Sequence, residues 1–128
     1  MSDRSAPMDS PTGATSTHWP DPRICVIRLT GDLDTATAPQ LTDYLRKQTS
    51  TRPVHLVLDL TEVRFLASAG ITLILTADAN AEGIHGRLHL VGVSDNHVVT
   101  HVLELCGVLE RLDIHDSLEE LLHHPDHD

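Results

Sequence analysis

The sequence predicts an α/β fold in which a mixed sheet of about five strands is backed by about four helices. Two runs, Val54–Leu60 and Arg87–Val93, are nearly continuously apolar, as is typical of strands covered on both faces in a mostly parallel sheet. Segments with apolar residues at helical spacing alternate with the strands. A chain of 128 residues is long enough for one core, so we expect one domain.

The domain is expected to span residues 15–123. Residues 1–14 are rich in Pro, Ser and Thr and have almost nothing apolar to bury, which predicts a disordered tail. Residues 124–128 are expected to fray. Thr15–Trp19 is compatible with an edge strand that turns at Pro20-Asp21-Pro22.

The first regular elements follow Ile24. The β-branched run Ile24–Thr30 predicts a strand that stops at Gly31. Asp34 or Thr35 can then cap a helix that continues to about Lys47, because its apolar residues repeat at helical spacing. The covered strand Val54–Leu60 comes next and is expected at the centre of the sheet.

Two further helices are marked by their ends. Ser68 is predicted to cap a helix over residues 69–81 that Gly83 terminates. Asp95 is predicted to open another helix, which Gly107 terminates.

A short strand and a last helix complete the predicted domain. The strand is expected near residues 111–114. A capping box, either Asp116 with Glu119 or Ser117 with Glu120, then starts a helix that carries three leucines.

The charge of the chain limits its partners. A formal net charge of −10 repels phosphate backbones and anionic lipid, which argues against nucleic acid or a membrane surface as partner. No apolar run approaches the roughly 20 residues that span a bilayer, and the N-terminus lacks the apolar segment of a signal peptide. We expect a cytoplasmic protein whose partner has a basic surface.

Cys25 and Cys106 lie 81 positions apart, which fits neither a disulfide framework nor a CxxC redox pair. One reading is two small buried hydrophobic residues. The other is a reversible redox bridge, which requires Cα atoms within roughly 7 Å of each other.

The sequence lacks the motifs of several kinds of enzyme. The turn Leu66-Ala67-Ser68-Ala69-Gly70 superficially resembles a hydrolase nucleophile elbow, but Leu66 stands where the first glycine of GxSxG is needed. Nucleotide-binding and zincin motifs are missing from the sequence. His97, His101 and Glu104 share a helical stripe that is expected to be solvated, so we expect no catalytic residue, no metal and no other cofactor.

Ser68 and the two aspartates of Thr30-Gly-Asp-Leu-Asp34 are the candidate functional residues. A serine at a helix start is a good phosphorylation site, because free N–H groups and the positive end of the helix dipole stabilise a phosphate. Asp32 and Asp34 are read as turn or recognition residues, because no third defined ligand accompanies them.

The segment Thr30–Asp34, followed by Leu58–Gly70 and then Ile71, resembles the STAS domain of bacterial anti-sigma factor antagonists. The resemblance covers about residues 15–122. It implies a STAS-like α/β fold and a non-enzymatic protein that binds an anti-sigma factor, itself a serine kinase in this family. Binding releases the sigma factor and so regulates transcription.

The resemblance also implies site residues. Ser68 takes the place of the phosphoacceptor, and phosphorylation would reverse binding. Ala67 and Ala69 depart from the family's Asp-Ser-Ser/Thr-Gly turn, which weakens the case for a phospho-switch and makes redox control by the two cysteines an alternative. The implied partner-binding residues are Asp32, Asp34, Ser68, Ala69, Gly70 and Ile71.

Two other functions stay open at this point. STAS-like domains also serve in membrane transport complexes, so the chain could be a stand-alone subunit of such a complex. A small-molecule or nucleotide sensor is a third hypothesis.

Overall fold

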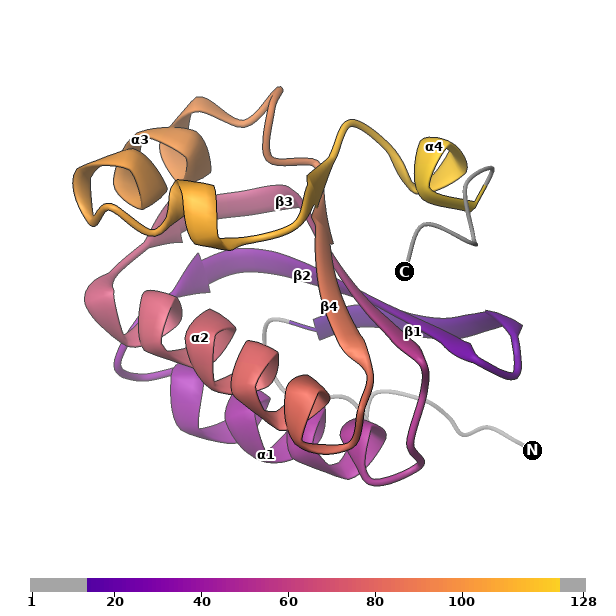
Figure 1. Cartoon of the computed structure of the whole chain (residues 1–128). Helices are drawn as coiled ribbons and strands as arrows, with labels where there is room; N and C mark the ends of the chain where they lie inside the picture. Colours follow the sequence, from indigo (N-terminus) through magenta and orange to yellow (C-terminus); the bar gives the residue numbers. More distant parts are fainter. Residues whose placement is uncertain (1–13, 123–128) are drawn as a thin grey trace.

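A computed structural model describes residues 14–122, which form one five-stranded sheet with helices around it (Figure 1). The strands lie in the order of the sequence, β1-β2-β3-β4-β5; β1 is antiparallel to β2 and all other neighbours are parallel. This confirms the mixed α/β fold. The strands are β1 (Ala14–Asp21), β2 (Ile24–Leu33), β3 (His55–Leu66), β4 (Arg87–Val91) and β5 (Ile114–His115).

Four α-helices accompany the sheet: α1 (Ala38–Thr49), α2 (Ser68–Gly83), α3 (His97–Leu105) and α4 (Leu118–Leu122). None of the helices within residues 14–122 has the length and hydropathy that crossing a membrane requires. The tails expected at residues 1–14 and 124–128 lie outside the described residues, except that Ala14 begins β1.

The two faces of the sheet bury different cores. A large core lies between the sheet and α1, α2 and α3, and a small one lies between the sheet and α4. Alternation along β2 divides its side chains between them, since Cys25 and Ile27 enter the large core and Ile24 and Val26 enter the small one. Burial on both faces explains why β2 reads as a continuous apolar run.

Strands β2 and β3 both run further than the apolar pattern predicts. β3 was expected to stop at Leu60, yet it continues to Leu66. Val63 and Leu66 stay buried and hold this extension on the core. The polar residues Thr61, Glu62 and Arg64 interrupt the apolar run and hide this extension from a reading based on continuous hydrophobicity.

β4 ends at Val91 and not at Val93 as predicted. Gly92 has a φ of +77°, a left-handed conformation that interrupts the strand. The backbone nitrogen of Thr61 lies 2.6 Å from the position that a Cβ on Gly92 would occupy, so only glycine fits this crossing.

The C-terminal strand prediction is wrong in its position. Leu109–Arg111 forms a 3₁₀ turn, and β5 is the two-residue pair Ile114–His115. Val108 and Leu112, on either side of this turn, both enter the large core.

Two helix starts also differ from the predictions. The N-cap of α2 is Ala67, in extended conformation, so Ser68 is the first helical residue and does not cap the helix. The N-cap of α3 is Asn96 and not Asp95. The Asn96 side-chain oxygen accepts a hydrogen bond from the backbone N–H of Val99 (3.3 Å), while its amide nitrogen donates to the carbonyl of Val63 (2.8 Å).

The last helix starts as one of the two predicted capping boxes. The hydroxyl of Ser117 accepts a hydrogen bond from the backbone N–H of Glu120 (3.0 Å). The Glu120 carboxylate reaches back to the backbone N–H of Asp116 (3.1 Å), one residue before the cap.

The two cysteines are free and have different surroundings. Cys25 is fully buried, and burial raises the pKa of its thiol to about 11. Cys106 is exposed at the end of α3. The redox pair stays an untested prediction, but burial disfavours the Cys25 thiolate that disulfide formation needs.

Gly70 lies where the start of α2 approaches the end of β2. A Cβ at this position would lie 2.8 Å from Leu33 Cβ and 2.9 Å from the Leu33 carbonyl oxygen. The absence of a side chain at Gly70 therefore sets how closely α2 begins beside β2.

We predict that Gly70→Ala lowers the free energy of unfolding by about 1–3 kcal/mol, because the clash with the Leu33 backbone outweighs the better helix propensity of alanine. Urea unfolding followed by circular dichroism measures the change. The matched control is Gly83→Ala in the same helix, where a Cβ meets nothing within 4 Å, so stability should stay the same or rise. If Gly70→Ala also left the free energy of unfolding unchanged, the packing argument would be contradicted.

We predict that the native protein shows one fast and one very slow thiol towards a disulfide reagent such as DTNB. Cys106 is exposed, whereas the Cys25 thiol is both inaccessible and far less ionised at neutral pH. Stopped-flow absorbance measures the two rates, and Cys106→Ser should remove only the fast phase. Equal rates in the folded state would refute this assignment.

Candidate functional site

The carboxyl ends of β2 and β3 meet at one edge of the sheet. In the parallel register Asp32 pairs with Phe65 and Leu33 pairs with Leu66. The backbone N–H of Ala67 donates to the carbonyl of Leu33 (2.9 Å), so the chain turns into α2 directly beside the end of β2. Register and turn together form what we call the β2–β3 end surface, made of Asp32, Asp34, Phe65 and Ser68.

The predicted contact residues differ in what they present to a partner. Asp32 and Ser68 are exposed, and Asp34 and Ala69 are half-buried. Gly70 and Ile71 are buried, so they support this surface from below and offer little area to a partner.

Phe65 is the residue that sequence reasoning missed. Its side chain is 51% exposed, although it precedes the buried Leu66 in an apolar segment. Val63 and Leu66 are the residues of this stretch that enter the core, and their spacing leaves Phe65 outside it. The pattern Val63-Arg-Phe-Leu66 breaks strict alternation, which is the one signal in the sequence that this strand end is irregular.

The acidic turn after β2 is held in a fixed shape. The Asp34 carboxylate accepts hydrogen bonds from the backbone N–H groups of Ala36 (3.0 Å) and Thr37 (3.1 Å). Thr37, which is the N-cap of α1, donates its hydroxyl to the carbonyl of Asp32 (2.8 Å). Asp34 therefore shapes the turn before α1. The prediction that Asp34 or Thr35 caps this helix is wrong, because the N-cap is Thr37.

An open hollow of about 590 Å³ lies beside this turn. Three carboxylates, from Asp32, Asp34 and Glu62, share its lining with the guanidinium of Arg64. The excess of negative charge favours a basic partner group.

Ser68 is exposed at the start of the sixteen-residue helix α2, whose first turn contains no acidic residue. Within residues 14–122 its hydroxyl makes no side-chain hydrogen bond, so no base of the described chain activates it as a nucleophile. An exposed hydroxyl at the positive end of a helix remains suited to accept a phosphoryl group.

The histidine stripe on α3 stays a surface feature. His97, His101 and Glu104 are all exposed and line a shallow hollow. The ligand atoms of these three residues do not lie within 4.8 Å of one another. Another group of three residues within 14–122 does meet that distance.

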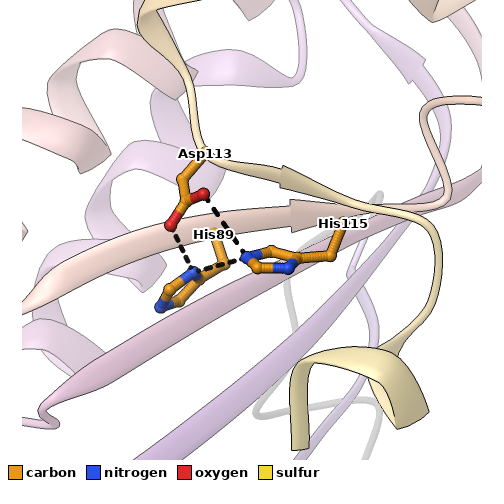
Figure 2. A group of neighbouring side chains, drawn as sticks. All are labelled: His89, Asp113 and His115. Carbon is orange, nitrogen blue, oxygen red and sulfur yellow. Dashed lines mark hydrogen bonds and ion pairs between the residues drawn. The ribbon is translucent and has the colours of Figure 1, made fainter. Parts of the chain in front are cut away.

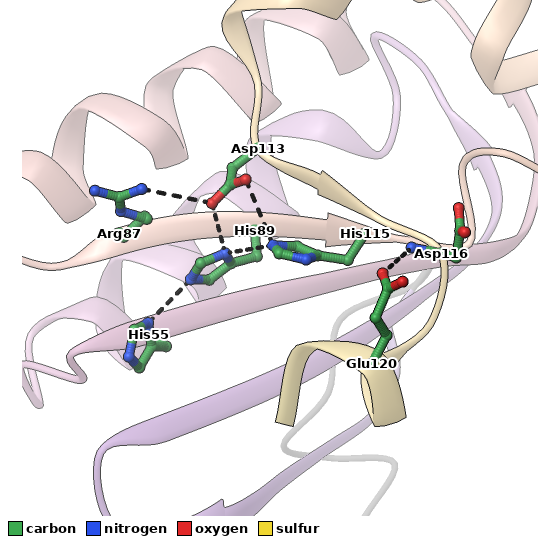
Figure 3. Close-up of polar contacts among 7 residues, drawn as sticks. All are labelled: His55, Arg87, His89, Asp113, His115, Asp116 and Glu120. Carbon is green, nitrogen blue, oxygen red and sulfur yellow. Dashed lines mark hydrogen bonds and ion pairs between the residues drawn. The ribbon is translucent and has the colours of Figure 1, made fainter. Parts of the chain in front are cut away.

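A row of histidines crosses the sheet face that carries the small core (Figure 3). His55 lies on β3, His89 on β4 and His115 on β5. His55 Nδ1 lies 2.9 Å from His89 Nε2, and His89 Nδ1 lies 3.1 Å from His115 Nε2. Asp113 completes the cluster, with its carboxylate 2.9 Å from His89 Nδ1 and 3.4 Å from His115 Nε2.

His89 is the buried member of this row, with 4% of its surface exposed. Burial, chiefly, lowers the pKa of His89 to about 4, and the Asp113 carboxylate opposes that effect. The imidazole of His89 is therefore neutral at neutral pH. Sequence reasoning missed the row because its members come from three strands, and only the spacings Arg87-x-His89 and Asp113-x-His115 hint at a shared face.

Comparisons with known proteins support the fold. Residues 20–121 match the STAS domain family. The anti-sigma-F factor antagonist RsfB of Mycobacterium tuberculosis is 25% identical over 115 residues, covering 90% of this chain and 92% of the relative.

Solved structures agree with that match. The crystal structure of an anti-sigma factor antagonist from Mycobacterium paratuberculosis superposes with a TM-score of 0.75 at 25% identity, covering 94% of this chain and 97% of that one. Unphosphorylated SpoIIAA, an anti-sigma factor antagonist, superposes with a TM-score of 0.71 at 20% identity, covering 87% and 95%. The family match over residues 20–121, the strand order and the arrangement at the ends of β2 and β3 lead to one conclusion: this chain belongs to the STAS domain family.

Proposed function

We propose that this protein is an anti-sigma factor antagonist that binds an anti-sigma factor through the β2–β3 end surface and so frees a sigma factor to direct transcription in the cytoplasm. The observation that carries the proposal is the exposed Phe65 paired in register with Asp32 and lying beside the start of α2. Relatives that cover nearly the whole chain bear the name anti-sigma factor antagonist. The protein acts by binding and supplies no catalysis of its own.

Phe65 has the properties of a binding anchor. Aromatic side chains dominate the free energy of many interfaces when they enter a pocket on the partner. Asp32 pairs in register with Phe65 and lines the neighbouring hollow with Asp34 and Glu62. This negative charge would select a partner with basic residues around that pocket. To displace the sigma factor from the anti-sigma factor almost completely requires roughly 5 kcal/mol of differential affinity. A standard interface of about 1,200–2,000 Å² with one buried aromatic anchor can supply this difference.

Phosphorylation of Ser68 would reverse this binding. A kinase partner transfers the γ-phosphoryl group of ATP to Ser68 Oγ, the hydroxyl proton leaves, and ADP is the product. The phosphate adds about −1.5 to −2 charges to a surface that already holds Asp32 and Asp34, next to a hollow that Glu62 also lines. Repulsion among these groups and the cost of desolvating the phosphate weaken the complex. The related fold of SpoIIAA is known in a phosphorylated form.

The two alanines beside Ser68 bear on this switch. Ala69 is half-buried and packs against the large core, so a hydroxyl in its place would point partly inward. Ala67 is the extended residue before α2. Neither alanine blocks access to Ser68, and the absence of a carboxylate at residue 67 lowers the charge that a phosphate would meet there.

The first prediction concerns Phe65. Phe65→Ala should weaken binding to the cognate anti-sigma factor about 10- to 100-fold, because it removes the aromatic anchor. Half of the Phe65 surface is exposed to water in the free protein and can be buried by a partner. Isothermal titration calorimetry against the anti-sigma factors of the source genome measures the affinity. The matched control is Leu105→Ala on α3, a large apolar residue that is 73% exposed outside this surface, and it should leave affinity unchanged. Equal effects of the two substitutions would exclude the β2–β3 end surface as the interface.

The second prediction concerns Ser68. Ser68→Glu should reduce the same affinity at least about tenfold through added negative charge, and Ser68→Ala should retain it. Incubation with the partner and ATP should add one phosphate to the wild type and none to Ser68→Ala, as read by mass spectrometry. If the partner binds but transfers no phosphate to Ser68, the proposed antagonist function still stands and the proposed control by phosphorylation is wrong.

The rival role as a subunit of a transport complex makes a different prediction. Recovery of transporter components in place of an anti-sigma factor, with binding insensitive to Phe65→Ala, would replace the proposal above.

A further inference from the structure

Three potential ligand atoms from β4, β5 and the residue before β5 face one point (Figure 2). They are Nδ1 of His89, the carboxylate of Asp113 and Nε2 of His115, separated by 2.9, 3.1 and 3.4 Å. Zinc bonds to nitrogen and oxygen are about 2.0–2.2 Å long, so two ligands of one tetrahedral ion lie roughly 3.3 Å apart. Each pair of residues therefore has ligand atoms near this spacing. The contacts to His89 and His115 use different oxygens of Asp113, and one ligand atom from each of the three residues lies within 4.8 Å of the others.

We propose that His89, Asp113 and His115 bind one zinc ion, with water completing the tetrahedron. Two imidazoles and one carboxylate suit a divalent transition ion of this kind better than calcium or magnesium, which prefer oxygen ligands throughout. Elsewhere among the described residues, no group of three His, Cys, Asp or Glu side chains brings its ligand atoms this close.

The hydrogen-bond arrangement favours an ion at this point. If His89 Nδ1 and His115 Nε2 both carry protons to reach the Asp113 carboxylate, their two N–H groups face each other across only 3.1 Å. If only one carries a proton, the carboxylate loses one of its two donors. A bound cation accepts the lone pairs of both nitrogens and of the carboxylate together, which removes this conflict.

His55 supplies the supporting contact that metal-binding histidines usually have. A metal on His89 Nδ1 leaves the proton on Nε2, which lies 2.9 Å from His55 Nδ1 and donates to it. Such a contact fixes both the tautomer and the ring orientation of the ligand. Because the structure already has this contact, His89 is oriented for binding.

The surroundings allow an ion to enter. The His89 side chain is 5% exposed, whereas Asp113 is 38% exposed and leaves an approach from solvent. Arg87 is the competing cation, with its guanidinium 3.7 Å from the Asp113 carboxylate. It is half-exposed and loosely placed, so it can withdraw into water when zinc takes its position.

Zinc would act as a clamp on the C-terminal part of the sheet. β4 and β5 pair at only two positions, Leu90 with Ile114 and Val91 with His115. A metal that joins His89 to Asp113 and His115 adds a strong link where the backbone pairing is short. This inference does not depend on the proposed function, because the β2–β3 end surface uses different strands.

The experiment uses the full chain carrying His123→Ala, His124→Ala and His127→Ala, so that histidines outside the described residues cannot bind the probe. Titration with zinc sulfate in a calorimeter should give one ion per chain. Cobalt(II) as a second probe should give the intense visible absorption of tetrahedral coordination. Zinc at about 100 times its dissociation constant should raise the melting temperature by about 5 °C or more.

Variants distinguish the site from its rivals. Asp113→Asn and His115→Gln, both on partly exposed residues, should each weaken zinc binding at least about tenfold and remove the thermal shift. The control His97→Ala with His101→Ala removes the two exposed histidines of α3 and should change neither readout. Circular dichroism without metal confirms that each variant folds.

Three results would overturn the proposal. The parent chain could bind no zinc at micromolar concentration, binding could survive both Asp113→Asn and His115→Gln, or it could disappear in the His97 and His101 control. Each outcome leaves the anti-sigma test untouched, since that test uses neither these residues nor zinc.

Discussion

The parallel pairing of β2 with β3 is the constraint on which the rest of the structure depends. It extends from Ile24 with His55 to Leu33 with Leu66, and it is the longest pairing in the sheet. Its amino-terminal part is covered on both faces and forms the centre of both cores. Its carboxyl-terminal part stays on the large core through Leu33, Val63 and Leu66, while Asp32 and Phe65 are exposed there. One continuous ladder therefore links the stability of the domain to the geometry of its proposed binding surface.

Much of this fold follows from local sequence, because covered strands and amphipathic helices leave strong patterns. The strand around Val57 and the capping box at Ser117 could be predicted from such patterns. Errors occurred where a distant contact decides the outcome. Gly92 ends β4 because Thr61 crosses beside it, and Asn96 opens α3 while its amide nitrogen is held by the end of β3.

The candidate sites also divide into features set by local sequence and features set by distant contacts. The motif around Ser68 lies at the carboxyl ends of β2 and β3, but the exposure of Phe65 depends on which neighbours enter the core. The histidine cluster could not be predicted, since His89 and His115 meet only through strand register and Asp113 through the loop before β5. Residues that are adjacent only across strands leave no period in the sequence.

The strand order of the sheet has a consequence for how the domain can change. From β2 to β5 each parallel connection steps to the next strand in the same direction, and right-handed crossovers of this kind place all their helices on one face. The large core lies under those helices, while among residues 14–122 the short helix α4 alone covers the opposite face. The second core contains far fewer buried residues than the large one, so polar side chains such as the histidine row can occupy that face without weakening the main core. Such a sheet has one face that preserves the fold and one that is free to diversify.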